Sequence, residues 1–425
     1  MRGRRRRLLF IAPVMPASAG NGLAMRAGLF LDALADDHEV YLLVIPVAGR
    51  AGERALPDLV ARRAAAVAIL PLEGRLDPHY ALLSRLRDPQ ERLAARLDYP
   101  RPFLDRFATS ETVREAAACF SAVPFDVAHV MRLYLAPFAR PYLEVPGPRP
   151  TCLLDLDDDE TATRQGLAAL HALRGDPCGE ALERAESRKF GQFERRWLPR
   201  FDGILVCSDR DRGALSERLG LRRVEVVPNA VRLPAPPRQR RRGEAGTLRL
   251  LFVGSLEYFP NVDAARFLCE EVRPRLAAMT ARSVCVQLVG ASPAPQVRRL
   301  ADLPGVSLKA SVADVGPYYA GADVVAVPVR AGGGTRIKVL EAFAHGVPVV
   351  STPVGAEGLD VEPGRHLLIA THAETFAAAC LRLVEEPARA RAQAARARAL
   401  VRARYAHRRV VASIRALYRS LGGLP

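Results

Sequence analysis

Three consecutive glycines, Gly332 to Gly334, stand just before two cationic side chains and a carboxylate, Arg336, Lys338 and Glu341. An apolar run that ends at Pro328 precedes them, and a helical pattern follows. A glycine-rich turn between strand and helix lets backbone N–H groups approach an anion, and the helix dipole favours negative charge there. Cations in the first helical turn oppose that dipole, so a bound diphosphate explains them better than solvent exposure. The pattern predicts an anion-binding site, with a plain tight turn as the alternative.

A second glycine turn, Gly20-Asn21-Gly22, follows the first apolar run of the chain and precedes a helical segment. It either contacts a bound anion or acceptor, or is an ordinary strand-to-helix connection, because a lone G-x-G is weak evidence. Arg26 follows on the same helix and is expected to face either an anionic acceptor or solvent.

The segment from Asp155 to Glu160 holds five carboxylates in six residues. Cations with oxygen ligands need such clusters. At a strand end before a helix, however, the same carboxylates favour the positive end of the helix dipole. Metal binding, a lining for the acceptor side of a cleft, and helix capping are the three interpretations, and we predict no metal site.

The elements that must position these residues alternate between strand and helix almost throughout the chain. The expected strands of the first half are residues 8–12, 40–45, 66–70, 126–130, 152–156, 203–207 and 224–227. Its expected helices are residues 23–35, several between 76 and 122, and 161–198 with an interruption near 175–177. In the second half we expect strands at 248–253, 284–289, 306–308, 323–327 and 348–351, and helices at 262–278, 336–344 and from 372 almost to the end.

Residues 228–247 interrupt the alternation with four prolines and a run of arginines, which is typical of an exposed linker. We therefore predict two α/β domains, residues 1–230 and 231–425, each with a doubly wound parallel sheet. Ligands of such sheets bind at the carboxyl ends of the strands, and a cleft between two facing domains is the expected site.

The chain carries 62 Lys and Arg against 46 Asp and Glu, a formal net charge of +16. A basic surface attracts anionic lipids, nucleic acid or phosphorylated substrates. The densest basic clusters are residues 4–7, 238–242 and 389–409, each either a solvated face or a seat on an anionic membrane. Few aromatic residues accompany them and no nucleic-acid signature occurs, so nucleic acid is not an expected partner. Seven scattered cysteines without a C-x-x-C pair indicate reduced thiols in a cytosolic protein, and no apolar run is long enough to span a bilayer.

The segment from Gly332 to Gly358 resembles glycosyltransferase family 4 in its pattern G-G-G-T-R-x-K-x-x-E-A-x-A-x-G-x-P-V-V-S-T-x-x-G-x-E-G. Phe252-Val253-Gly254-Ser255 with Pro260-Asn261 supports this, and the resemblance is specific over residues 224–360. It implies the GT-B fold, in which two Rossmann-like domains face each other across a cleft. It also implies that the last helix, about 407–421, packs back on the N-terminal domain.

The resemblance also assigns roles at the matching positions. The family's ribose-binding glutamate falls on Glu341, whereas a second glutamate near the donor sugar is replaced by Gly333. Many members place an arginine and a lysine after the first strand of the second domain, but Ser255 stands there instead, so we expect Arg336 and Lys338 to hold the diphosphate.

His129 is either a structural core residue or the family's histidine that contacts the donor sugar. The predicted catalytic residues are His129, Arg336 and Lys338. The predicted donor-binding residues are Gly20, Asn21, Gly22, Ser255, Gly332, Gly333, Gly334, Thr335 and Glu341.

Together these features predict a hexosyltransferase-type glycosyltransferase. It would move a sugar from a nucleotide diphosphate-sugar to an acceptor hydroxyl of a glycolipid, polysaccharide, lipid-linked sugar or small molecule, without a cofactor. The family resemblance implies that the reaction retains the anomeric configuration and needs no essential metal. The expected location is the cytoplasm, peripheral at the inner face of the plasma membrane, with an anionic membrane surface as a further partner. The alternative is a catalytically inactive GT-B binding or scaffold protein, for which Gly333 is the best argument.

Overall fold

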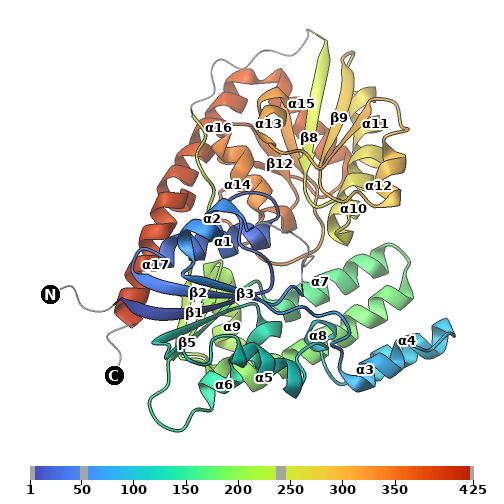
Figure 1. Cartoon of the computed structure of the whole chain (residues 1–425). Coiled ribbons are helices and arrows are strands. Elements are labelled where there is room, and N and C mark those ends of the chain that lie inside the picture. The colour runs from blue at the N-terminus through green and yellow to red at the C-terminus, as the bar shows by residue number, and fades with distance from the viewer. Residues whose placement is uncertain (1–4, 48–55, 236–245, 422–425) are drawn as a thin grey trace. The chain divides into compact units, whose positions relative to one another are not determined.

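A computed structural model describes residues 5–47, 56–235 and 246–421 of the chain (Figure 1). The chain divides into two compact units. The first comprises Met1–Pro228 with Val410–Pro425, and the second Asn229–Arg409. The basic cluster at 238–242 and residue Arg4 lie outside the described residues.

The first unit contains a seven-stranded sheet in the order β3-β2-β1-β4-β5-β6-β7, in which each pair of neighbours is parallel. Its strands are β1 (Arg6–Ala12), β2 (His38–Val44), β3 (Ala66–Ile69), β4 (Val127–Met131), β5 (Thr151–Asp157), β6 (Gly203–Val206) and β7 (Val224–Val226). The strand order reverses between β1 and β4. That reversal is the switch point at which open α/β sheets bind ligands.

Helices cover both faces of this sheet, because alternate residues of a buried strand point to opposite sides. On one face, Phe10 of β1 contacts the ring of His129 on β4, and Phe30 of α1 (Gly22–Leu34) packs on the same imidazole. On the other face, Leu9 and Val130 join the core that includes Trp197 of α8 (Pro177–Trp197).

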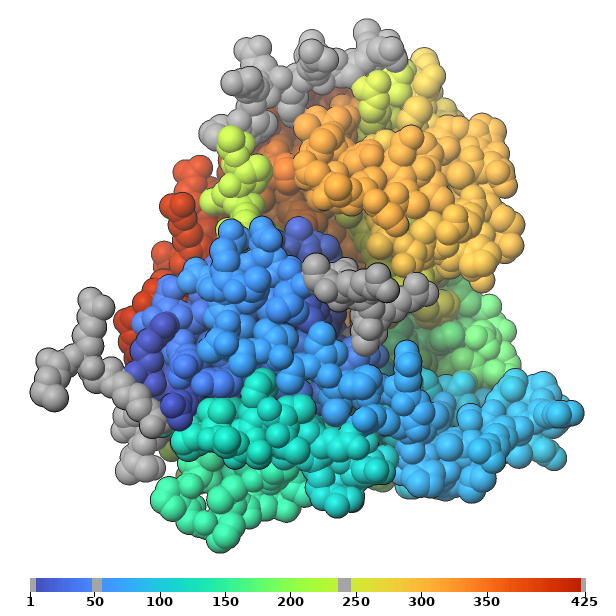
Figure 2. Space-filling model, in the orientation of Figure 1, coloured from blue at the N-terminus to red at the C-terminus, as the bar shows by residue number. Residues whose placement is uncertain are grey.

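The remaining helices of the first unit are short apart from α7 (Glu160–Leu173), which lies beside α8 (Figure 1). They are α2 (Asp58–Arg63), α3 (Pro78–Leu83), α4 (Pro89–Asp98), η1 (Phe103–Asp105), α5 (Ser110–Ala118), η2 (Leu133–Ala139), α6 (Arg140–Leu143), η3 (Leu198–Arg200) and α9 (Asp209–Leu219). No residue of α3 or α4 is buried, and both helices lie on the surface of this unit (Figure 2, light blue).

The last helix, α17 (His407–Leu421), returns the chain to the first unit. Arg415 forms ion pairs of 2.9 and 2.8 Å with Asp36 and Asp37, which follow α1. The Tyr418 hydroxyl hydrogen-bonds to Nδ1 of the buried His129 at 2.5 Å. Surface charge pairs and one buried polar contact therefore hold α17 against this unit.

The second unit contains a six-stranded sheet in the order β10-β9-β8-β11-β12-β13, again with parallel neighbours. Its strands are β8 (Thr247–Val253), β9 (Ser283–Gly290), β10 (Val306–Ala310), β11 (Val324–Val327), β12 (Val349–Ser351) and β13 (Leu368–Ile369). The prediction of two parallel-sheet, Rossmann-like domains is confirmed.

One helix of the second unit departs from the expected regular form. The helix expected over 262–278 runs from Phe259 to Ala278 as α10 (Phe259–Arg266), the π-helical η4 (Phe267–Val272) and α11 (Arg273–Ala278). The other helical segments are α12 (Pro295–Leu300), α13 (Gly316–Gly321), α14 (Ile337–Ala344), η5 (Val354–Ala356), α15 (Ala373–Glu385), α16 (Pro387–Leu400) and the π-helical η6 (Val401–Tyr405).

Two further observations bear on the sequence-based expectations. The seven cysteines, which all lie within the described residues, form no disulfide. Among the described residues, no helix combines the length and apolar character that crossing a bilayer requires.

A buried ion pair joins three segments of the first unit. Arg26 of α1 is 1% exposed and donates to both carboxylate oxygens of Asp155 on β5, at 2.7 and 2.6 Å. It also donates to the carbonyl of Val227, at 3.0 Å. Although burial disfavours the charged guanidinium, the Asp155 carboxylate raises the pKa of Arg26 above its usual value. The expectation that Arg26 faces an acceptor or solvent is therefore wrong, since its donors are turned into the protein.

We expect Arg26→Met to lower the free energy of unfolding of the first unit by about 3–5 kcal/mol, because it leaves the Asp155 carboxylate buried without its partner. The chain has a single tryptophan, the buried Trp197 of this unit, so its fluorescence during urea unfolding reports on the relevant transition.

Arg184→Ala is the control, because Arg184 forms an exposed i,i+4 pair with Glu180 on α8. Its loss should cost about 0.5 kcal/mol or less. The double variant Arg26→Met/Asp155→Leu should recover much of the loss. Equal midpoints for Arg26→Met and Arg184→Ala would show that the buried pair does not stabilise the unit.

Candidate functional site

The triple-glycine turn follows β11 at the carboxyl end of the second sheet. Gly332 and Gly334 have φ angles of 122° and 64°, in the left-handed region that side chains rarely adopt. Val329 and Ala331, just before the glycines, are buried. Glycine is therefore required by the path of the backbone here.

The side chain of Arg336 hydrogen-bonds to the backbone of this turn. It is the N-cap residue of α14, which begins at Ile337, and is 8% exposed. Its guanidinium donates to the carbonyl of Gly333, to that of Gly334 at 2.8 Å and to that of Gly332 at 2.8 Å. The arginine thus supplies hydrogen-bond donors to three carbonyls of the turn. These carbonyl acceptors reduce the unfavourable interaction between its positive charge and the N-terminal end of the helix dipole.

Lys338 lies one residue into α14. Its ammonium donates to Oδ1 of Asn261 at 2.7 Å and sits 4.4 Å from the ring centroid of Phe252 at the end of β8. Among the described residues it forms no ion pair. Burial, and then the charge of Arg336, lower the pKa of Lys338 to about 7, against a smaller opposing effect of Glu341. A cation without a carboxylate partner is prepared to bind an anion, because binding would remove this penalty.

Glu341 lies one turn further along α14. Its Oε2 accepts a hydrogen bond of 2.9 Å from the hydroxyl of Tyr319, a fully buried residue of α13. The Tyr319 ring stacks on His345 at 4.8 Å between centroids. Burial raises the pKa of Glu341, while the Tyr319 hydrogen bond and the charge of Lys338 oppose that change. Tyr319 therefore orients the carboxylate through one oxygen.

The loop after β8 approaches the start of α14 from the neighbouring strand. Ser255 is partly exposed, and its backbone carbonyl accepts from Nδ2 of Asn261 at 2.8 Å. Thr335 is buried and its hydroxyl accepts from Nδ2 of Asn229 at 2.9 Å. The predicted residues Ser255, the three glycines, Thr335, Arg336, Lys338 and Glu341 thus all belong to one edge of the second sheet.

Two residues of this edge were not among the predicted site residues. Asn261 contacts Lys338, and Tyr319 contacts Glu341. Asn261 occurs in the motif Pro260-Asn261, which supports the family resemblance, but a sequence motif alone does not show which side chain it contacts.

The glycine turn of the first unit follows β1 at the switch point of its sheet. Gly20 has φ 109°, and Gly20 and Asn21 are exposed. Asn21 is the N-cap of α1, with its side chain accepting from the N–H of Ala24 at 2.8 Å. The turn is thus an open, capped connection, and its role toward a ligand stays a prediction.

His129 lies in the middle of β4. Its side chain is fully buried between Phe10, Phe30 and Tyr418. Burial and the charge of Arg26 lower the pKa of His129 to about 3. The prediction of a catalytic His129 therefore needs correction, because a neutral imidazole enclosed by core side chains packs the unit and anchors α17.

Arginines neutralise the acidic segment 155–160. Asp155 pairs with Arg26, while Asp158 and Glu160 pair with Arg132, which follows β4. Asp159 pairs with Arg218 at 2.8 Å and caps α7 by accepting from Ala162 N–H at 2.9 Å. Capping is thus observed, and the described residues contain no group of acidic, histidine or cysteine side chains arranged to hold a metal ion.

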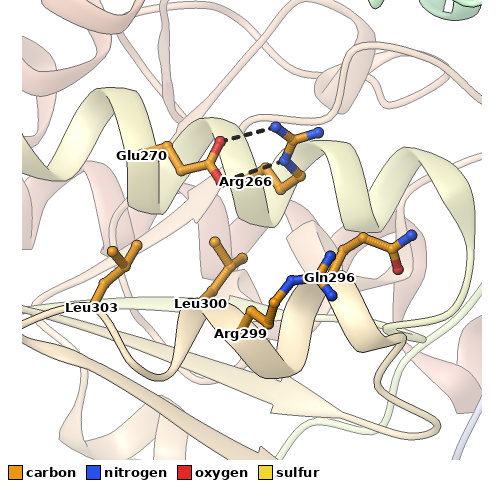
Figure 3. Close-up of a pocket in the computed structure, with 6 residues that line it drawn as sticks. All are labelled: Arg266, Glu270, Gln296, Arg299, Leu300 and Leu303. Atoms are coloured by element: carbon orange, nitrogen blue, oxygen red, sulfur yellow. Dashed lines mark hydrogen bonds and ion pairs between the residues drawn. The ribbon is translucent and has the colours of Figure 1, made fainter.

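A groove of about 300 Å³ opens elsewhere on the second unit (Figure 3). It is lined from the α10–η4 and α12 segments by Arg266, Glu270, Gln296, Arg299, Leu300 and Leu303. Arg266 and Glu270 pair with each other across one helical turn. None of the predicted site residues contributes to this groove.

A family model matches the part of the chain that contains this edge. Residues 247–386, which include the whole edge from Ser255 to Glu341, match the family model "Glycosyl transferases group 1". No curated protein sequence matches the chain.

Solved structures with a similar fold cover nearly the whole chain. Sucrose-phosphate synthase from Thermosynechococcus elongatus is 18% identical with a TM-score of 0.69, covering 98% of this chain and 99% of that one. HepE from Anabaena, in complex with UDP and glucose, is 15% identical with a TM-score of 0.61, covering 99% and 100%. TarM from S. aureus is 9% identical with a TM-score of 0.67, covering 99% and 100%. The fold is that of GT-B proteins, and together with the family model it supports a GT-B glycosyltransferase.

Proposed function

We propose that this chain is a retaining glycosyltransferase that transfers a hexose from a nucleotide diphosphate-sugar to an acceptor hydroxyl. The observation that carries the proposal is the ammonium of Lys338, which lies among neutral partners next to Arg336 and the triple-glycine turn. A diphosphate supplies the negative charge that these groups lack.

In the proposed reaction, the bond between the sugar's anomeric carbon and the diphosphate breaks as the acceptor oxygen bonds to that carbon. Negative charge then grows on the leaving diphosphate. Lys338, Arg336 and the backbone N–H groups at the start of α14 would stabilise it, and fixed cations and dipoles of this kind stabilise a transition state without reorganising.

Glu341 is proposed to accept hydrogen bonds from the ribose hydroxyls. Its Oε2 is engaged by Tyr319, so Oε1 remains available for a sugar. The base would pack against β10 and Ser311, which follows that strand with φ 52°. UDP-glucose is the first donor to test, because the similar HepE has been crystallised with UDP-glucose.

The second candidate function is a GT-B binding or scaffold protein without turnover. It is favoured by one observation, the glycine at position 333, where the family's second glutamate would stand. Both candidates bind the nucleotide sugar, so transfer of the sugar to an acceptor or to water separates them.

We expect Lys338→Met, Arg336→Ala and Glu341→Ala each to weaken donor binding or abolish turnover while the protein stays folded. Loss of a charge-assisted hydrogen bond costs about 1.5–3 kcal/mol, which corresponds to roughly 10- to 150-fold in affinity. Binding by isothermal titration calorimetry with UDP-glucose, and hydrolysis or transfer of the donor, measure the two effects.

Lys338→Met is the most informative of the three, because Arg336→Ala also removes the donors that hold the turn. The control is Arg365→Ala, since Arg365 is exposed and pairs only locally with Glu362. Wild-type affinity and turnover in a folded Lys338→Met protein would refute this site.

The proposed reaction needs no metal, since fixed cations and a helix terminus neutralise the diphosphate. Activity should survive chelation by EDTA. The chemistry would have to be reassigned to the acidic segment around Asp155 and Asp157 if EDTA abolished activity and manganese restored it.

We also propose a cytoplasmic enzyme seated peripherally on the anionic inner face of the plasma membrane, with a lipid-linked sugar or polysaccharide as acceptor. The support is a set of exposed arginines in α16, η6 and α17 for which no acidic partner is found among the described residues: Arg391, Arg396, Arg402, Arg408 and Arg409. By contrast, Arg7 of the N-terminal cluster is already engaged by Glu39, and Arg5 by backbone carbonyls.

The protein should float with liposomes that contain anionic lipid at low salt, but not at 1 M salt, where the Debye length falls to about 3 Å. The triple variant Arg391→Gln/Arg396→Gln/Arg402→Gln should lose flotation. A control with the same charge change, Arg184→Gln/Arg365→Gln/Arg382→Gln, alters arginines that already pair with nearby glutamates and should float normally. If the wild type did not float with anionic liposomes even at low salt, peripheral membrane binding would be excluded.

A further inference from the structure

The amide of Asn261 links the two loops that form the proposed diphosphate site. Asn261 lies in α10 and is 8% exposed. Its Nδ2 donates to the carbonyl of Ser255 at 2.8 Å, and its Oδ1 accepts from the ammonium of Lys338 at 2.7 Å. One side chain therefore fixes the loop after β8 and the cation at the start of α14 relative to each other.

The absence of a side chain at Gly254 leaves space for the side chains of Lys338 and Asn261. A Cβ at position 254 would lie 2.9 Å from Nζ of Lys338 and 2.9 Å from Nδ2 of Asn261. Phe252, two residues earlier, supports the ammonium from its ring face at 4.4 Å. The ammonium is thus packed against the backbone just after β8, although it belongs to a helix that follows β11.

The Asn261 oxygen that accepts the hydrogen bond from Lys338 is uncharged, and this matters as much as its position. An amide oxygen orients an ammonium by a hydrogen bond but does not cancel its charge. A carboxylate in the same place would pair with the ammonium and repel an incoming phosphate. The charged groups that act on Lys338 are Arg336 and Glu341, and the other two groups in contact with it, Asn261 and Phe252, are neutral.

We propose that Asn261 is a positioning residue for Lys338, which holds the ammonium beside Gly254 and leaves its charge free for the donor diphosphate. This inference rests on the proposed function, because it names the group that prepares the same site. It also explains how a chain without a cation in the loop after β8 places one there from α14.

The test is the affinity for UDP-glucose between pH 6 and pH 9, measured by calorimetry for the wild type and for Asn261→Asp. The diphosphate of UDP-glucose carries no proton that titrates in this range. In the wild type the affinity should fall as the pH rises through about 7, because Lys338 then loses its proton.

Asn261→Asp keeps the shape of the side chain but loses the donor to the Ser255 carbonyl, so a purely structural role predicts at most weaker binding with an unshifted pH profile in the folded protein. The positioning role predicts an affinity at pH 7 about tenfold lower or worse. It also predicts that the fall of affinity moves to higher pH, since a carboxylate beside Lys338 raises the pKa of that ammonium. Gly254→Ala should weaken binding without shifting the fall to higher pH, because it displaces the ammonium and adds no charge.

Gln393→Glu is the matched control, since Gln393 is another buried amide of the same unit and accepts from the N–H of Val349, outside the site. It should leave the affinity and its pH profile unchanged, whatever it does to stability. Wild-type affinity and an unshifted pH profile in folded Asn261→Asp would overturn the role of Asn261 and leave the site intact. Failure of the wild type to bind UDP-glucose, GDP-mannose and ADP-glucose would instead overturn the proposed function, and this inference with it.

Discussion

The hydrogen bond between Lys338 and Asn261 joins the two strand ends on which the candidate site depends. Because β8 and β11 are parallel neighbours, their carboxyl ends lie side by side and the loops that follow them meet. Gly254 leaves space for the side chains of Asn261 and Lys338, and the positive φ angles of Gly332 and Gly334 shape the turn before α14. The ammonium of Lys338 is thereby held beside neutral groups and forms no ion pair with a carboxylate of the described residues.

At the carboxyl edge of the first sheet, by contrast, the charged side chains have partners of opposite charge. Arg26, Arg132 and Arg218 each form ion pairs with carboxylates of the segment 155–160, so these carboxylates have cationic partners within the unit. These pairs connect α1, β4, β5, α7 and α9 and stabilise the loops around the switch point. This contrast favours the second unit for the proposed anion binding, because its Lys338 has no carboxylate partner among the described residues.

Much of the fold follows from the sequence because apolar runs of strand length alternate with helical periodicity. Each expected strand is present within a few residues. The glycine turn could be predicted because three consecutive glycines precede Arg336 and Lys338, and the φ angles of Gly332 and Gly334 explain why glycine stands there. Short helices such as α9, α12 and α13, and the strand β13, were not expected, since segments this short carry little periodicity. The π-helical segment in the middle of the 259–278 helix has no sequence signal that distinguishes it from a regular helix.

The site was harder to predict than the fold because long-range contacts decide what a polar residue does. His129 and Arg26 looked like candidates for ligand contact, but the residues that enclose them, Tyr418 and Asp155, are distant in sequence. For the same reason Asn261 and Tyr319 were missed as partners of Lys338 and Glu341. Composition and spacing identify which residues can do chemistry, whereas tertiary packing decides which of them face a ligand.

The central claim is that Lys338 binds the donor diphosphate, and a crystal structure of the protein with UDP tests it most directly. The account predicts a phosphate oxygen within about 2.7–3.2 Å of the Lys338 ammonium, with the nucleotide's ribose at Glu341. A UDP molecule bound with its phosphates away from Lys338, or with Lys338 still enclosed by Asn261 and Phe252 and making no phosphate contact, would contradict it.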